Sequence, residues 1–445
     1  MWNIINIFIL TLFIFFIFSF LKQKYIFTLL LISIFLLPRA GFVISEMLLP
    51  LPIGYIIVVV LVIKYFIGRV IIFKVNESKV YNPIARFFPF YLVISAYSFI
   101  NSIIYKANTG VVFLELCFYV FSFFLYFVLV RIFAKDALID LFIKGIIVIS
   151  LLVSIYGLLV YFFGKSMLIN YLTYNSTQTG AIGALEYYKR TLSSYGDPNA
   201  LGAQLVIFCP ILFMLLFSIK LSVFKRIFLL VTLLLNCACL LLTESRGALI
   251  GLGIAIIALI ISKFRRSWFV VPAVISIVTL ILIQPATFYE SHRAFDEELI
   301  IGDERLNFGT LTKNIIVNIP LGVGFGVTMD DFNNIQVAHS IWNGYNSFYL
   351  QLLSKVGIPG VFLFLLMLFA MLKYFISNLK FIKDPLRRNF VFGASVGIIG
   401  SQVSWYANNI YMLPGGMLNF WMLCVMLTVI VSIEKREYLA SQKNV

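Results

Sequence analysis

The chain has 445 residues, of which 62% are hydrophobic and only 12% are charged. Its mean hydropathy of +1.01 is far above that of ordinary soluble globular proteins and excludes that class. The formal net charge of +15 is distributed over short segments between apolar runs, whereas a nucleic-acid-binding protein gathers its basic residues on one aqueous domain.

Apolar runs long enough for transmembrane helices follow one another along almost the whole chain. A helix crosses a bilayer with about 17 to 25 apolar residues and satisfies its own backbone hydrogen bonds there, so we predict an all-α polytopic membrane helix bundle of about 12–13 transmembrane helices. The first run lacks a basic start and a small-residue cleavage site, which favours a retained span over a signal peptide. The predicted spans lie near residues 4–21, 25–38, 51–68, 87–105, 110–134, 139–163, 199–218, 227–243, 247–263, 268–285, 356–379, 389–411 and 416–433.

The basic residues predict the orientation of these spans, because Lys and Arg in short loops stay on the cytoplasmic side. With the basic clusters inside, the C-terminal tail is cytoplasmic and the two long loops lie outside. The chain then divides into transmembrane helices at 1–285 with an outer loop at 164–198, a large extracytoplasmic loop at 286–346, C-terminal transmembrane helices at 347–433 and a tail at 434–445. Any chemistry is therefore expected to face outward.

The first outer loop ends in "YYKRTLSSYGDPNALGAQL", residues 187–205. Its G-D-P-N turn precedes an apolar helix, so Asp197 or Asn199 is predicted to cap that helix. A cap alone is the simpler interpretation of this segment. Arg190 is nevertheless unusual, because the charge rule disfavours an arginine in an outer loop.

The next outer turn is very short and lies in "LLLTESRGALIGLG", residues 240–253. Glu244 and Arg246 stand there between two spans, and charges near membrane depth cost several kcal/mol unless they pair or face a cavity. They are therefore functional candidates, with a purely structural contact between the two as the alternative. Glu115, in "GVVFLELCFYVF", is a second partly buried acid that we expect to pair with an arginine.

The large loop contains "DERLNFGTLTKNIIVNI", residues 303–319, in which apolar residues recur at helical spacing. This pattern predicts an interfacial helix that stops before Pro320. The following "GVGFG" has neither a preceding strand nor a following phosphate-binding helix, which argues against a dinucleotide site. Asp330 and Asp331 have ligand chemistry suited to a divalent cation, although two adjacent acids in a polar loop are usually only solvated.

Arg190, Arg246 and Arg305 thus come from three separate outer segments and are expected to converge on one face of the bundle. Arginine carries a permanent charge and a planar fork that matches phosphate oxygens. This set suits a lipid-linked diphosphate, whose tail would lie between helices while its head group is neutralised.

Four segments in this order resemble the O-antigen ligase and polymerase superfamily of bacterial membrane glycosyltransferases: "RTLSSYGDPNALG", "LLTESRGALIGLG", "ERLNFGTLTKNIIVNIPLGVGFG" and "NSFYLQLLSKVGIPG". The resemblance covers about residues 145 to 430. It implies glycan transfer from undecaprenyl diphosphate to a sugar hydroxyl outside the membrane, with no nucleotide sugar, required metal or other cofactor. It also implies that the three arginines hold the diphosphate.

The last segment departs from the ligase pattern, because Asn346 occupies the position where the ligases carry histidine. An asparagine amide does not take up a proton near neutral pH, so Asn346 can orient an acceptor but cannot act as its base. His339, seven residues upstream, is the candidate base, with an incidental loop histidine as the alternative. The supporting candidates are Glu244, Asp197, Asn199 and Tyr345.

The missing histidine favours a Wzy-type polymerase of an O-antigen, capsule or exopolysaccharide, in the bacterial cytoplasmic (inner) membrane. A ligase that transfers glycan to lipid A core is the first alternative, and a transporter of lipid-linked oligosaccharide is the second. The transporter is less favoured because the halves of the chain show no internal repeat. The expected partners are the undecaprenyl-diphosphate-linked oligosaccharide, membrane lipid, and flippase and chain-length regulator proteins, with no nucleic acid.

Overall fold

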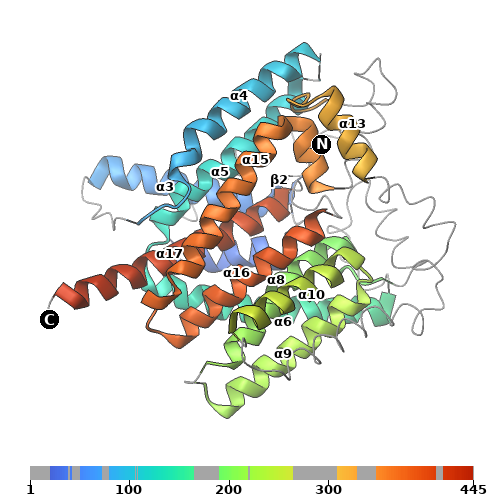
Figure 1. The fold of residues 1–445 in the computed structure, drawn as a ribbon. Coiled ribbons are helices and arrows are strands. Elements are labelled where there is room, and N and C mark those ends of the chain that lie inside the picture. The colour runs from blue at the N-terminus through green and yellow to red at the C-terminus, as the bar shows by residue number, and fades with distance from the viewer. Residues whose placement is uncertain are drawn as a thin grey trace.

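The computed structural model describes residues 21–38, 41–42, 51–72, 80–105, 107, 109–164, 190–218, 221–263, 308–327, 347–406 and 414–443. In these ranges the chain is a bundle of long helices (Figure 1), with one antiparallel pair of two-residue strands. The all-α class expected from the sequence is confirmed. The predicted spans at 4–21 and 268–285 lie outside the described residues.

The long helices follow the predicted apolar runs closely at most ends. Two depart from them: α15 begins eight residues before the expected position, and α17 continues ten residues past it. The elements are α2 (Gln23–Leu31), η1 (Ile32–Leu36), β1 (Gly41–Phe42), β2 (Leu51–Pro52), α3 (Ile53–Ile72), η2 (Ala85–Phe87), α4 (Phe88–Ile104), α5 (Thr109–Ile132), α6 (Asp136–Phe163), η5 (Ser193–Tyr195), α8 (Pro198–Leu216), α9 (Val223–Leu242), α10 (Arg246–Lys263), α13 (Phe308–Asn318), α15 (Phe348–Ser377), η9 (Leu379–Phe381), α16 (Pro385–Tyr406) and α17 (Pro414–Lys443).

Several of these helices are suited to a membrane by length and composition. Among the described residues, six are long and apolar enough to cross a bilayer, and four shorter apolar helices accompany them. The protein is therefore a multi-pass membrane protein. The helix predicted between residues 303 and 319 is present as α13, which ends at Asn318, ahead of Pro320.

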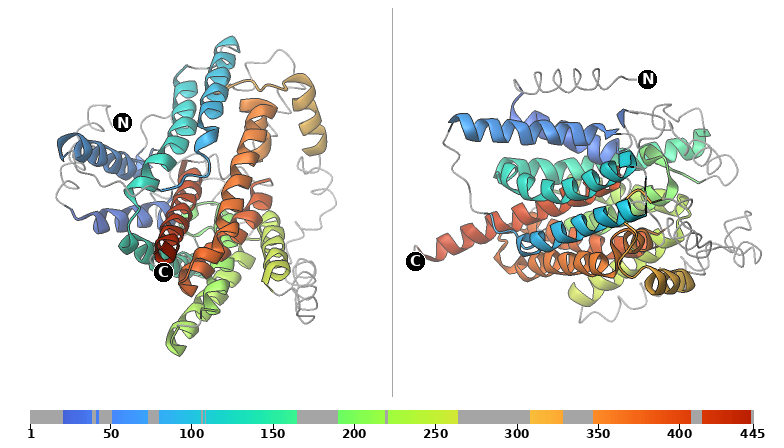
Figure 2. Two further views of the ribbon diagram at one scale, coloured as in Figure 1. Left: turned by 60° about the vertical axis from the view of Figure 1, so that its left-hand side comes forward. Right: turned by 90° about the horizontal axis from the view of Figure 1, so that it is seen from above.

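The helices differ in how much of their surface the protein itself covers. In its most apolar stretch, α17 is 94% buried inside the protein, and α8 is 83% buried. The corresponding stretch of α9 is only 28% buried. We infer that α8 and α17 are enclosed by other helices, whereas α9 presents Val223, Phe224 and Ile227 to the lipid. The C-terminal end of α17 projects past the neighbouring helices (Figure 2) and carries mostly exposed or half-buried residues.

Glycines allow α8, α10 and α16 to approach one another closely. A Cβ atom at Gly393 would lie 2.6 Å from the Pro210 carbonyl oxygen, and one at Gly400 would lie 2.5 Å from that of Gly251. Small residues let helix backbones meet in a membrane, where van der Waals packing rather than the hydrophobic effect holds helices together. These contacts fix α8, which leads into the candidate site, against the rest of the bundle.

Contacts between helix ends sort those ends into two sets. At one end, which we call the Arg190 end, the C-terminal parts of α4, α6 and α9 meet the N-terminal parts of α8 and α15. At the other, the Arg387 end, the N-terminal ends of α2, α6 and α16 meet the C-terminal ends of α5 and α17. This alternation is the one expected of a chain that crosses a membrane repeatedly.

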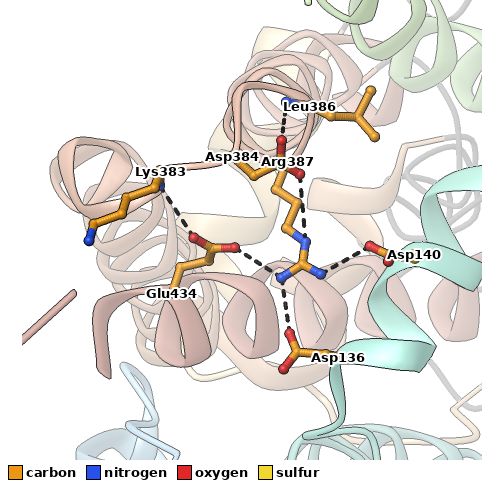
Figure 3. Close-up of polar contacts among 7 residues, drawn as sticks. All are labelled: Asp136, Asp140, Lys383, Asp384, Leu386, Arg387 and Glu434. Carbon is orange, nitrogen blue, oxygen red and sulfur yellow. Dashed lines mark hydrogen bonds and ion pairs between the residues drawn. The ribbon is translucent and has the colours of Figure 1, made fainter. Parts of the chain in front are cut away.

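A group of charged residues joins three helices at the Arg387 end (Figure 3). The Arg387 guanidinium lies 3.0 Å from carboxylate oxygens of Asp136 and Asp140 on α6 and 2.9 Å from Glu434 on α17. It also lies 3.8 Å from Asp384, just before α16. One planar cation with several donors therefore ties α6, α16 and α17 together.

Candidate functional site

Arg190 links two helices at the Arg190 end. Its Nε donates to the Thr243 carbonyl oxygen at 2.8 Å, and its Nη2 donates to the Asn199 side-chain oxygen at 3.1 Å. The backbone N–H of Thr191 donates to the Leu242 carbonyl at 3.0 Å. The guanidinium thus supplies a partner for a carbonyl at the C-terminal end of α9, where a cation is favoured electrostatically.

The turn between α9 and α10 brings Arg246 next to that contact. Thr243 accepts from Arg190, and Arg246, three residues later, is the first residue of α10. Between them Glu244 has a positive φ of 50°, a left-handed conformation that is uncommon for a residue other than glycine. Arg190 and Arg246 therefore lie on either side of one tight turn. The convergence of all three arginines stays a prediction, because Arg305 lies outside the described residues.

The first turn of α8 packs directly on this turn. A Cβ atom at Gly202 would lie 2.7 Å from Cβ of Ala248 and 3.2 Å from Cβ of Ser245. Gly202 is thus required for the close approach of α8 and α10, and any larger side chain would push the two arginine-bearing segments apart.

The structure separates the roles of the two polar residues at the start of α8. Asp197 is the N-cap, and its side chain accepts from the backbone N–H of Ala200 at 2.8 Å. Asn199 lies inside the helix, where its side chain accepts from Arg190. The cap that was predicted as Asp197 or Asn199 is therefore Asp197, and Asn199 orients the arginine.

Glu115 has a different partner from the expected arginine. Its Oε1 lies 2.7 Å from Nζ of Lys355 on α15, and its Oε2 accepts from the backbone N–H of Gly326 at 2.9 Å. The expectation of an arginine was wrong about the residue type, because the side chain of Glu115 reaches a lysine of α15 instead. Sequence reasoning overlooked Lys355, although a lysine within an apolar helix is itself a signal of a paired or functional charge.

The glycine-rich segment "GVGFG" has a structural role in the described part of the chain. Gly322, Gly324 and Gly326 all have positive φ values, and the segment lies against α4, α5 and α15. Glycine is needed here because the backbone approaches its neighbours too closely for a Cβ atom. The segment therefore packs as a turn against these three helices.

The remaining predicted residues, Arg305, His339, Tyr345 and Asn346, lie outside the described residues, as do Asp330 and Asp331. Ser347, the neighbour of Asn346, is the N-cap residue of α15 and is fully buried. Within the part of the chain that the structure describes, its hydroxyl makes no hydrogen bond. Within the described ranges, no group of three or more His, Cys, Asp or Glu side chains is placed to hold a metal ion.

The middle of the chain is similar to one family of known proteins. Residues 229–365 match the family described as O-antigen ligase. The match runs from α9 through the turn that carries Arg246, α10 and α13 into α15, and so includes three of the four motifs quoted above. No curated protein matches the chain. The match supports, over residues 229–365, the resemblance to the O-antigen ligase and polymerase superfamily.

Proposed function

We propose that the protein is a polymerase that joins undecaprenyl-diphosphate-linked oligosaccharide repeat units into a surface polysaccharide. The reaction takes place at the Arg190 end, on the outer face of the bacterial cytoplasmic membrane. The supporting observation is that Arg190 and Arg246, which are far apart in the sequence, flank one turn at the same end of the bundle. The family match is consistent with a membrane glycosyltransferase.

The chemistry requires charge stabilisation more than activation of the donor. The bond between the anomeric carbon and the diphosphate oxygen breaks, and the acceptor hydroxyl oxygen bonds to that carbon. The diphosphate leaves with the electron pair, so permanent cations such as Arg190 and Arg246 stabilise the developing charge. The hydroxyl proton passes to a base, for which His339 is our candidate, while Asn346 orients the acceptor.

Arg190 is suited to this task because it is held before substrate arrives. Its bonds to Thr243 and Asn199 fix the direction of the guanidinium. A preorganised cation costs little reorganisation when charge develops during the reaction. Asp197 and Gly202 contribute indirectly, since one starts α8 and the other seats it on the turn.

A ligase that transfers glycan to lipid A core is the second candidate, because the matching family is described as O-antigen ligase. Asn346 favours the polymerase, since the ligases carry histidine at that position. A transporter of lipid-linked oligosaccharide would bind the same diphosphate without making a glycosidic bond. These three functions give different products from the same substrate.

The test supplies purified protein in lipid vesicles with one lipid-linked repeat unit as the only substrate. A ladder of lengthening lipid-linked glycans is the expected result. Product that forms only after lipid A core is added would identify a ligase, and movement of the substrate across the vesicle without new bonds would identify a transporter. Either of these outcomes would overturn the polymerase.

Variants of Arg190 test the diphosphate role. Arg190→Ala should lower kcat/KM on the order of 100-fold, the loss seen when one preorganised donor is removed. Arg190→Lys keeps the charge but loses the fork, and should recover only part of the activity. Weaker inhibition by added polyprenyl diphosphate would separate ligand binding from a structural defect. Arg388, exposed at the Arg387 end, provides the control, and Arg388→Ala should retain activity.

The orientation of the chain has its own test. If the basic loops are cytoplasmic, a fluorescent protein fused after Val445 will fluoresce, whereas alkaline phosphatase fused there will stay inactive. An active phosphatase fusion would place the Arg190 end inside and contradict the proposed outward-facing site.

A further inference from the structure

Two apolar helices come to an end next to each other at the Arg387 end. Helix α15 is broken at Gly357, where φ is 67°, and its second, longer part runs to Ser377, just before η9. The apolar part of α17 runs to Ile433, after which charged residues begin. Basic residues that follow an apolar span lie at the depth of the lipid headgroups. The residues after these two points therefore face the membrane surface.

An aromatic pair joins the two segments at this level. The rings of Phe381, in η9, and Tyr438, in α17, have centroids 5.3 Å apart. Both side chains are half-buried. Because aromatic rings at this separation attract each other, the pair keeps η9 close to the last turns of α17.

Three lysine side chains gather around this aromatic pair. Lys380 Nζ lies 5.1 Å and Lys435 Nζ lies 5.3 Å from the centroid of the Phe381 ring. Lys383 Nζ lies 5.5 Å from the centroid of the Tyr438 ring. Two of the three lysines are exposed, and Lys435 is half-buried. An ammonium group within about 6 Å of a ring centroid is attracted by that ring, so the rings hold three like charges close together.

Two acidic residues next to these lysines are held by Arg387 instead. The Arg387 guanidinium lies 2.9 Å from Glu434 and 3.8 Å from Asp384. Lys383 offers Glu434 only its backbone N–H, and its ammonium group points away from the guanidinium (Figure 3). In the ranges that the structure describes, none of the three lysines forms an ion pair. Their charges therefore have no counter-charge within these ranges.

We propose that Lys380, Lys383 and Lys435 bind the headgroup of an anionic phospholipid. The phosphate oxygens of the headgroup accept charge-assisted hydrogen bonds from the ammonium groups. The acyl chains lie against the apolar surface of α15, where Ile376, just before η9, is 42% exposed. A lipid fits better than a soluble phosphate ester, because the charges stand where two apolar helices end. The site is independent of the proposed function.

The experiment titrates the detergent-purified full chain with lipid and follows binding by native mass spectrometry. Dioleoylphosphatidylglycerol should bind more tightly than dioleoylphosphatidylcholine. The triple variant Lys380→Gln, Lys383→Gln, Lys435→Gln should weaken phosphatidylglycerol binding on the order of 100-fold, at about 5-fold for each lost charge. Its binding of phosphatidylcholine should stay unchanged. An excess of soluble glycerol 1-phosphate should not displace the lipid, and displacement would overturn the proposal in favour of a soluble ligand.

A matched triple variant separates this site from a simple effect of net charge. Lys22→Gln, Lys24→Gln and Lys225→Gln remove three exposed lysines near the N-terminal ends of α2 and α9, and this variant should bind phosphatidylglycerol as the wild type does. Phe381→Leu with Tyr438→Leu keeps the lysines without the rings that gather them, and should weaken binding by a smaller factor than loss of the charges. Wild-type binding in the first triple variant, or an equal loss in both triple variants, would overturn the proposal.

Discussion

Replacing Arg387 with methionine should destabilise the bundle, because the change leaves acidic side chains from three helices without their shared cation. Methionine keeps an apolar stem of similar length, so the perturbation is mainly electrostatic. Glu434 is the residue most affected, since only 8% of its side chain is exposed. Its carboxylate also accepts from the backbone N–H of Lys383 at 3.3 Å.

The size of the effect follows from the exposure of each acid. Losing the partner of a buried carboxylate costs about 3 kcal/mol. Asp136 and Asp140 are each 53% exposed, so solvent screens them and their pairs contribute about 0.5 kcal/mol each. The loss of roughly 4 kcal/mol should lower Tm by about 8 °C, at about 2 °C per kcal/mol for a large domain.

Thermal unfolding of the detergent-purified protein, followed by intrinsic fluorescence, measures this change. Arg387→Met combined with Glu434→Gln should recover more than half of the lost Tm, because no buried charge then remains unpaired. The neighbouring control, Arg388→Met, should stay within about 1 °C of the wild type. A wild-type Tm for Arg387→Met would refute the reasoning, since it would mean that Glu434 needs no cation.

Three further substitutions test local features of the fold. Gly357→Ala should lower the free energy of unfolding by at least about 1 to 2 kcal/mol because of the left-handed backbone alone. The clash with Leu321 should lower it further. A wild-type Tm would show that α15 is not broken there. Asp197→Ala removes the N-cap of α8 and should lower the free energy of unfolding by about 1 kcal/mol. Asp197→Asn should retain most of that stability. Gly400→Leu should lower Tm and speed amide exchange in α10, because overpacking typically costs about 1 to 3 kcal/mol; unchanged exchange would contradict the close contact with Gly251.

The sequence predicted the helices well because the requirement for a span is local. An apolar run of sufficient length must form a helix in lipid, whatever it packs against. The predicted spans at 110–134 and 199–218 accordingly correspond to α5 and α8 within a few residues. The positions of Arg190 and Arg246 at one end also followed from the sequence, since alternating spans place every second loop on the same side.

Residue partners were beyond the sequence because they depend on which helices lie side by side. Glu115 and Lys355 are 240 residues apart, and no local pattern indicates that their side chains meet. The break at Gly357 was missed for the same reason, since the hydrogen bonds that compensate it come from residues 320–324. Hydropathy alone placed the start of this span at residue 356, next to the break, and did not include the short helical segment that precedes it.

The sequence by itself thus determined the class of protein, the approximate extent of its described helices and the end of the bundle that carries Arg190 and Arg246. Each of these depends on the free energy of moving a short stretch of chain from water into lipid. The tertiary structure decided that Asp197 caps α8, that Asn199 holds Arg190 and that Lys355 neutralises Glu115. These pairings require the close approach of helices that small residues such as Gly202 and Gly400 permit, and that approach is a property of the packed bundle.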